Sequence, residues 1–109
     1  MPKYLWQVSY TPQGVQGLQK DGGSARRTAV QRLVEQAGGK LECFYFAFGE
    51  ADAYTIAELP DPATAAAVSL AVNALGAVHL RTVPLLTPEE IDAATKKSID
   101  YRPPGSGAR

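Results

Sequence analysis

The sequence has few of the residues that usually build metal centres or catalytic thiols. Among its 109 residues there is one cysteine, Cys43, and one histidine, His79. A single cysteine excludes an internal disulfide and any metal site that needs several thiolates. A lone histidine cannot assemble a three-ligand zinc site without carboxylate help. We therefore expect no metal and no cofactor.

An excess of charge of one sign is also missing, as are long hydrophobic runs. Eleven Lys and Arg residues balance eleven Asp and Glu residues, so the formal net charge is zero. This balance argues against a protein held mainly by phosphate contacts, and we expect no nucleic-acid partner. No stretch approaches the roughly 18 apolar residues that span a bilayer, and the start lacks a signal-peptide core. We expect a cytoplasmic protein with a reduced thiol and no membrane partner.

The overall composition is typical of a small globular protein. Hydrophobic residues make up 45% of the chain and charged residues 20%, which argues against a disordered tail or a membrane span. The length suits one domain, which we place at residues 1–97. Residues 98–109 contain prolines, glycines and arginines, and we expect them to form a flexible tail.

The first half of the chain predicts a strand and a helical crossover in two pieces. Residues 3–10 are rich in aromatic and β-branched residues, with four large side chains on one face by the two-residue period: Tyr4, Trp6, Val8 and Tyr10. Thr11 and Pro12 are typical of a helix start. The pair Gly22-Gly23 interrupts that helix, and a second helical segment begins at Ser24 and ends at Gly38-Gly39.

The second half predicts three more strands and two more helices. The strands are expected over residues 40–48, 53–59 and 78–86, and the helices over 62–75 and from Pro88 to Lys96-Lys97. The order β-α-β-β-α-β with a terminal helix predicts an α+β, ferredoxin-like fold with a four-stranded antiparallel sheet. Pro84 predicts an edge position for the last strand, because proline cannot donate to a strand ladder.

The predicted sheet lacks a clearly polar face. In the second strand one face is expected to carry Leu41, Cys43, Tyr45 and Ala47, and the other Phe44, Phe46 and Phe48. A second copy packed sheet against sheet would cover the side without helices, so we predict a homodimer or higher homo-oligomer. The helix 62–75 is apolar most of the way round, as expected when a helix is buried on more than one side. In the alternative, a monomer keeps the open face wet through Glu42, Glu58, Gln7 and Ser9.

Three segments carry a resemblance to a known family. They are Lys20-Asp21-Gly22-Gly23-Ser24-Ala25-Arg26-Arg27, then Gly38-Gly39-Lys40, then Phe46-Ala47-Phe48-Gly49-Glu50-Ala51-Asp52-Ala53-Tyr54. Over about residues 3–95 the chain resembles the GYD domain family. The resemblance implies a ferredoxin-like fold of the dimeric α/β-barrel type, found in small bacterial and archaeal proteins. The family is named after a Gly-Tyr-Asp motif, and this chain has Gly49 and Asp52 but Ala51 next to the aspartate in place of the tyrosine.

The glycine-arginine segment is the first candidate binding site. It comprises Gly22, Gly23, Ser24, Arg26 and Arg27. Backbone N–H groups at a helix start converge on anions, and arginines make bidentate contacts to phosphate or carboxylate. The spacing matches no nucleotide-binding motif. In the alternative, the segment is a flexible break between helices, with both arginines on a solvated face.

Four further residues are candidates for ligand contact or proton transfer. Gly49 suits a turn that needs positive φ, and Asp52 can accept a hydrogen bond from a turn backbone or stand at the mouth of a pocket as base or ligand contact. Tyr54 follows two residues later. His79 offers a base near neutrality and shares a strand face with Arg81; in the alternative, it is a surface residue of an edge strand.

These observations support two hypotheses of function. In the first, the protein is a small oligomeric binding or regulatory module for a small, partly apolar or anionic ligand, held between helices and sheet or between two subunits. In the second, it is a cofactor-free dimeric α/β-barrel enzyme of the oxygenase, isomerase or decarboxylase type. The second hypothesis needs the catalytic candidates Asp52, Tyr54 and His79 at the cavity, where they would move protons.

Overall fold

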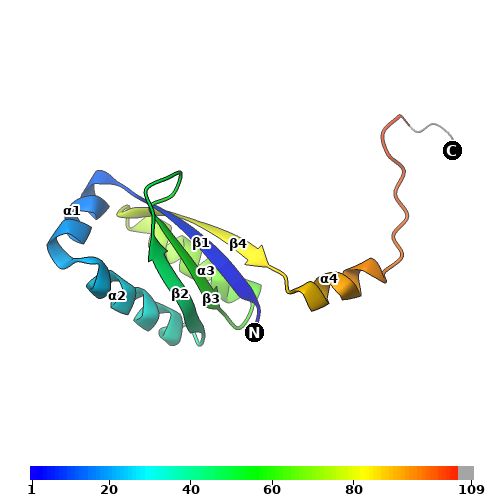
Figure 1. Cartoon of the computed structure of the whole chain (residues 1–109), viewed down its shortest axis with the longest axis horizontal. Helices are drawn as coiled ribbons and strands as arrows, with labels where there is room; N and C mark the ends of the chain where they lie inside the picture. The colour runs from blue at the N-terminus through cyan, green and yellow to red at the C-terminus, as the bar shows by residue number, and fades with distance from the viewer. Residues whose placement is uncertain (106–109) are drawn as a thin grey trace.

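The computed structural model describes residues 1–105 and forms a four-stranded antiparallel sheet in the order β2-β3-β1-β4 (Figure 1). The elements are β1 (Lys3–Tyr10), α1 (Pro12–Asp21), α2 (Gly23–Gln36), β2 (Lys40–Phe46), β3 (Ala53–Glu58), α3 (Pro62–Ala74), β4 (Val78–Leu85) and α4 (Pro88–Thr95). The order is that of a ferredoxin-like fold, as predicted. Strand β4 lies at an edge, which accommodates Pro84. The end of the expected tail, residues 106–109, lies outside the described residues.

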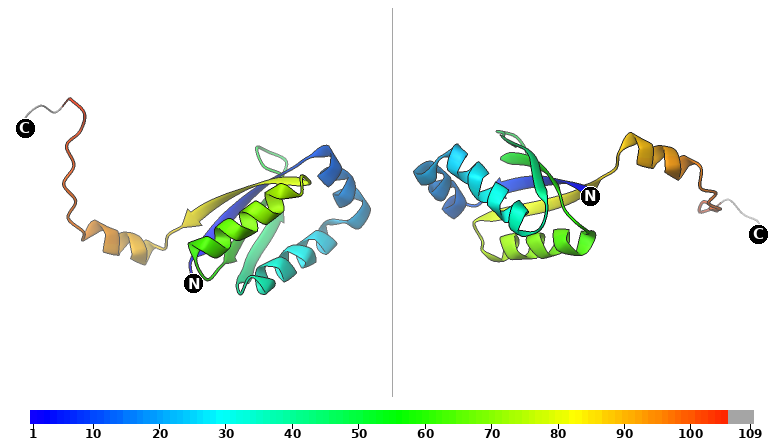
Figure 2. Two further views of the ribbon diagram at one scale, coloured as in Figure 1. Left: turned by 180° about the vertical axis from the view of Figure 1, so that it is seen from behind. Right: turned by 90° about the horizontal axis from the view of Figure 1, so that it is seen from below.

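The core lies between one face of the sheet and helices α2 and α3, which both cover that face in Figure 2. Tyr4 and Trp6 of β1 are buried there, together with Ala57 of β3. Val34 reaches the same core from α2 and Val68 from α3. The predicted large-residue face of β1 is therefore the inner face, because alternate residues of a strand share one side.

Strand β2 departs from the expected alternation. Its pairing with β3 shifts register between Leu41 and Cys43, so Glu42 is the extra residue of a β-bulge. Leu41 stands opposite the buried Ala57 on the helix side, whereas Cys43 and Tyr45 lie on the open side. The prediction that Leu41 shares a face with Cys43 and Tyr45 is wrong, because the bulge inverts the alternation after it.

The connection from β2 to β3 is longer than expected and covers residues 47–52. Within residues 1–105, positive φ occurs at Gly22, Gly38, Gly76 and Gly105, and Gly49 is not among them. A Cβ added to Gly49 would meet no atom within 4 Å. The positive φ expected at Gly49 is therefore wrong, because this loop turns without a left-handed residue there.

Helix α1 packs against the connection between α3 and β4 and is hydrogen-bonded to it. As predicted, Thr11 caps the helix, with its Oγ1 accepting from Gly14 N at 3.2 Å. Thr11 N donates to Ala77 O at 3.1 Å, and Thr11 Oγ1 lies within donating distance of the same oxygen at 3.0 Å. Gly14 completes the contact, because an added Cβ would lie 2.0 Å from Ala77 O. The first turn of α1 thus packs directly against the backbone of Ala77.

The exposed edge of β4 is partly closed by α3. Leu80 N donates to Asn73 Oδ1 at 2.7 Å, and Asn73 Nδ2 donates to Leu80 O at 3.1 Å. One side chain therefore satisfies both backbone groups of an edge-strand residue, which reduces the tendency of that edge to pair with another strand.

Two surfaces of the described chain carry apolar residues without a partner in the same chain. Helix α3 buries Ala65 and Val68, while Leu70 and Leu75 on its outer side are 74% and 79% exposed. Burial of α3 on more than one side is therefore not found within a single chain. Helix α4 projects away from the sheet and is exposed along its whole length (Figure 1). No helix in residues 1–105 is long and apolar enough to cross a membrane.

Candidate functional site

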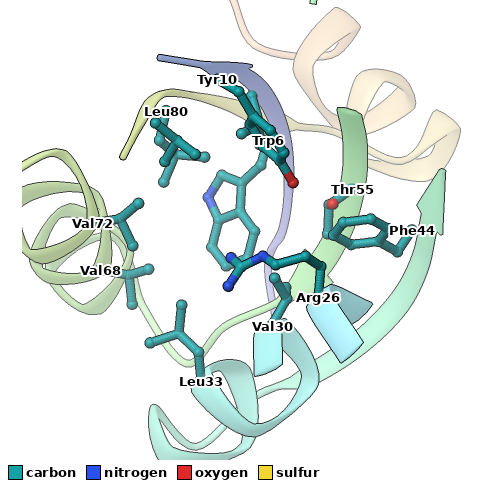
Figure 3. Close-up of a pocket in the computed structure, with 12 residues that line it drawn as sticks. Trp6, Tyr10, Arg26, Val30, Leu33, Phe44, Thr55, Val68, Val72 and Leu80 are labelled. Atoms are coloured by element: carbon teal, nitrogen blue, oxygen red, sulfur yellow. The ribbon is translucent and has the colours of Figure 1, made fainter. Parts of the chain in front are cut away.

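The main cleft enters the protein between the helices and the inner face of the sheet. Its deep part, the inner cavity, has a volume of about 60 Å³ and lies against Trp6, Thr55 and Phe44 (Figure 3). It adjoins an outer cleft of about 490 Å³ between α1, α2 and α3. Six residues line both parts: Tyr10, Arg26, Val30, Leu33, Val72 and Val78. The two parts therefore form one path from the surface to the core.

Three buried polar atoms on the inner face have no hydrogen-bond partner among residues 1–105. They are Trp6 Nε1, Thr55 Oγ1 and Thr82 Oγ1. The strand register places them in one row across the sheet, because Trp6 stands opposite both Thr55 and Thr82. Trp6 is 2% exposed and Thr55 1% exposed. A buried donor without a partner costs about 1–3 kcal/mol, so this polar row is unusual in an apolar core.

Arg26 brings a positive charge to this row. It stands in the first turn of α2, is half-buried, and lines both parts of the main cleft. Figure 3 shows its side chain directed toward the indole of Trp6. No acidic residue of the described chain forms an ion pair with Arg26, and none lines the inner cavity. The cavity therefore combines apolar walls with an unbalanced guanidinium.

The rest of the predicted glycine-arginine site is divided between two places. Gly22, at φ +85°, ends α1 and precedes α2. Gly23 packs against Phe46, since an added Cβ would lie 2.9 Å from its ring. Ser24 and Arg27 line a separate hollow of about 280 Å³ together with Gly23, Phe44 and Phe46. The structure thus brings Arg26 to the main cleft and leaves Arg27 outside it.

Asp52 holds the end of β1 in place. Its Oδ2 accepts a hydrogen bond from Tyr10 N at 2.9 Å, and its own N–H donates to Val8 O at 2.7 Å. Asp52 also lines a third pocket, of about 440 Å³, together with Tyr10 and Gly23. Asp52 therefore positions Tyr10, which lines the main cleft, but Asp52 does not line that cleft itself. Gly49 lines none of these pockets.

Tyr54 and His79 lie on the opposite side of the sheet. Tyr54 stands opposite Gln7, and His79 opposite Ser9, at positions that alternate with the inward-facing Thr55 and Leu80. Asp52, Tyr54 and His79 therefore do not meet Arg26 at one cavity. Within residues 1–105 no group of three or more His, Cys, Asp or Glu residues could hold a metal ion.

Comparison with known proteins identifies the family. The model of the GYD domain matches residues 4–95. The chain belongs to the GYD domain family. No curated protein and no solved structure matches it. In this GYD domain protein the match runs from β1 to the end of α4 and includes the buried Ala51.

Sequence reasoning did not single out the residues at the deep end of the cleft of this GYD domain protein. The sequence pattern points to Trp6 only as part of the large-residue face of residues 3–10, and Thr55 is not among the candidate residues. A threonine between Ala53 and Ala57 on a core-facing strand is a detectable signal, because buried hydroxyl groups normally have a partner. The lack of such a partner appears only once the strands are aligned.

Proposed function

We propose that this GYD domain protein binds a small, largely apolar ligand in the main cleft. The observation that supports this proposal is the continuity of an apolar cleft from the surface to the buried Trp6. Small-molecule sites usually measure about 300–1,000 Å³ and combine apolar walls with a few placed polar groups. Val30, Leu33 and Val72 supply the walls along the shared path, and Tyr10 and Arg26 supply the polar groups.

The arrangement supports binding over proton transfer by the residues expected from the sequence. A catalytic base must lie within hydrogen-bond reach of the proton that it removes. Tyr54 and His79 stand on the open face of the sheet, and Asp52 is engaged with Tyr10 N. A ligand in the main cleft would be separated from Tyr54 and His79 by the sheet.

Trp6 provides a direct experimental test, because it is the only tryptophan in the chain and lines the inner cavity. Titration with 1-octanol should change the intensity or wavelength of Trp6 emission in a saturable way. Ala29→Phe should weaken this response, since Ala29 is exposed and lines the outer cleft. Ala25→Phe is the matched control, because Ala25 is exposed on α2 one turn before Ala29 and does not line the cleft. Equal responses in both variants, or none in the unmodified protein, would overturn the proposal.

We also propose that a second copy of the chain covers the open face of the sheet. The register aligns an apolar row across all four strands, formed by Cys43, Ile56, Leu5 and Val83. The neighbouring row contains Tyr45, Tyr54, Gln7 and Arg81. In a two-fold symmetric dimer the same row would serve both partners, so a self-complementary apolar centre favours this arrangement.

Charged residues of the open face are partly neutralised at one end of it. Lys3 Nζ hydrogen-bonds to Glu42 and lies 3.7 Å from Glu58 Oε2. The hydrogen bond to Glu42, followed by the charges of both carboxylates, raises the pKa of Lys3. Lys3, Glu42 and Glu58 are therefore partly neutralised by one another at one end of the open face, and the apolar row lies beside them.

Mass measurement in solution tests this assembly. The unmodified protein should have twice the mass of one chain, and Tyr45→Lys with Val83→Lys should dissociate it. Tyr45 is 70% exposed and Val83 38% exposed in the single chain, so these changes should leave the fold intact. Leu70→Lys, on the outer side of α3, is the control. A monomeric unmodified protein, or dissociation by the control alone, would contradict the open face as interface.

A further inference from the structure

We infer that the ligand of the main cleft is a narrow, apolar monocarboxylic acid whose carboxylate lies at the inner cavity. This inference rests on the proposed function and specifies the chemical class of the ligand. It starts from the guanidinium of Arg26, which lines the inner cavity, and from the buried indole N–H of Trp6, which has no partner among residues 1–105.

Both groups require an acceptor, whereas the Thr55 hydroxyl lies on the other side of the indole ring from Nε1 (Figure 3). An indole N–H donates only, a guanidinium donates from five N–H bonds and never accepts, and a threonine hydroxyl can do either. The inner cavity has no acidic residue in its lining and no described residue pairs with Trp6 Nε1 or Thr55 Oγ1. A carboxylate supplies several acceptor positions and the negative charge that Arg26 lacks. A neutral alcohol could accept one hydrogen bond but brings no negative charge, and a cation would be repelled by the guanidinium.

The dimensions of the cleft indicate where each end of the ligand goes. The inner cavity of about 60 Å³ exceeds the roughly 10–15 Å³ that one water molecule needs, so it has room for a small head group. Beyond it, the outer cleft of about 490 Å³ can hold an apolar chain along Val30, Leu33 and Val72. Asp21 lines the outer cleft, and its carboxylate disfavours a second negative charge at the far end of the ligand. The site therefore selects monoacids over diacids.

Binding requires local movement of side chains. Trp6 Nε1 and Thr55 Oγ1 are covered by their neighbours. Arg26 is half-buried and reaches across the cavity from α2 (Figure 3), so its side chain is placed to shift and then close over a carboxylate. The gain on binding has two sources, namely a partner for the buried N–H of Trp6 and a charge partner for Arg26.

Four probes of equal chain length separate these contributions: octanoate, 1-octanol, octylammonium and octanedioate. Each is titrated while Trp6 fluorescence is recorded. Octanoate should bind about tenfold or more tightly than 1-octanol, because a hydrogen bond to a charged group is worth this factor. Octylammonium and octanedioate should bind more weakly than octanoate.

One variant tests Arg26, with a second as control. Arg26→Gln should reduce the preference for octanoate over 1-octanol by about tenfold. Arg32→Gln removes the same charge from an exposed position of α2 outside the cleft and should leave the preference unchanged. Thermal unfolding of each variant verifies that it folds.

The possible results separate the inference from the proposed function. If none of the four probes binds, the proposed function fails and the inference fails with it. If 1-octanol binds as tightly as octanoate, or if Arg26→Gln and Arg32→Gln behave alike, the cleft binds apolar molecules but the carboxylate inference is wrong. Tighter binding of octylammonium would also overturn it.

Discussion

Two glycines of α1 should respond in opposite ways to the same substitution. Alanine stabilises a helix interior by about 0.5–1 kcal/mol relative to glycine, because glycine loses more backbone entropy on folding. At Gly17 an added Cβ meets no atom within 4 Å. Gly17→Ala should therefore raise the melting temperature by about 2–8 °C, at roughly 4–8 °C per kcal/mol for a domain of this size.

At Gly14 the same Cβ would lie 2.0 Å from Ala77 O and 3.0 Å from Ala77 C. Backbone must move by about an ångström, and Ala77 O cannot retreat freely because it accepts a hydrogen bond from Thr11 N. Overpacking of this kind costs about 1–3 kcal/mol, which exceeds the gain in helix propensity. The net loss of about 0.5–2 kcal/mol should lower the melting temperature of Gly14→Ala by about 2–16 °C.

Thermal unfolding followed by circular dichroism, with urea unfolding as a second measurement, compares the two variants with the unmodified protein. The reasoning predicts opposite signs for changes three residues apart in one helix. Equal stabilisation by Gly14→Ala and Gly17→Ala would refute the close contact between α1 and the connection from α3 to β4.

Three further outcomes are expected. Asn73→Ala should destabilise the protein by about 1–2 kcal/mol in urea unfolding, because it removes both hydrogen bonds to Leu80, whereas Ser69→Ala should have little effect. Thr55→Val should stabilise the protein without ligand by about 1 kcal/mol, since a buried hydroxyl without a partner is replaced by a methyl group, and a loss of stability would contradict this. The Thr64 N–H holds the pKa of Asp61 below its usual range, so this carboxylate stabilises the fold at neutral pH and the contribution disappears as the pH falls below about 4. Asp61→Asn, which retains a capping side chain, should give a flatter decline of stability at acid pH, and an unchanged decline would argue against the contribution.

Much of the fold follows from local features of the chain. Thr11, Asp61 and Thr87 cap α1, α3 and α4 as their sequence positions predict, and each acts on N–H groups two or three residues away. The alternation of large residues in β1 indicates its inner face, and Pro84 indicates the edge strand. These predictions succeed because capping, proline geometry and strand periodicity depend on residues close together in the chain.

The candidate site depends on contacts between distant segments, and here the sequence pattern was insufficient. The sequence offers no way to distinguish the adjacent Arg26 and Arg27. In the structure Arg26 lines the main cleft and Arg27 lines a separate hollow, because they point in different directions from α2 as it crosses the sheet. The row of Thr55, Trp6 and Thr82 exists only through the register of three strands. The bulge at Glu42 likewise depends on how β2 meets β3. Local chemistry thus determined which elements form, whereas packing between them determined which polar groups were left buried without a partner.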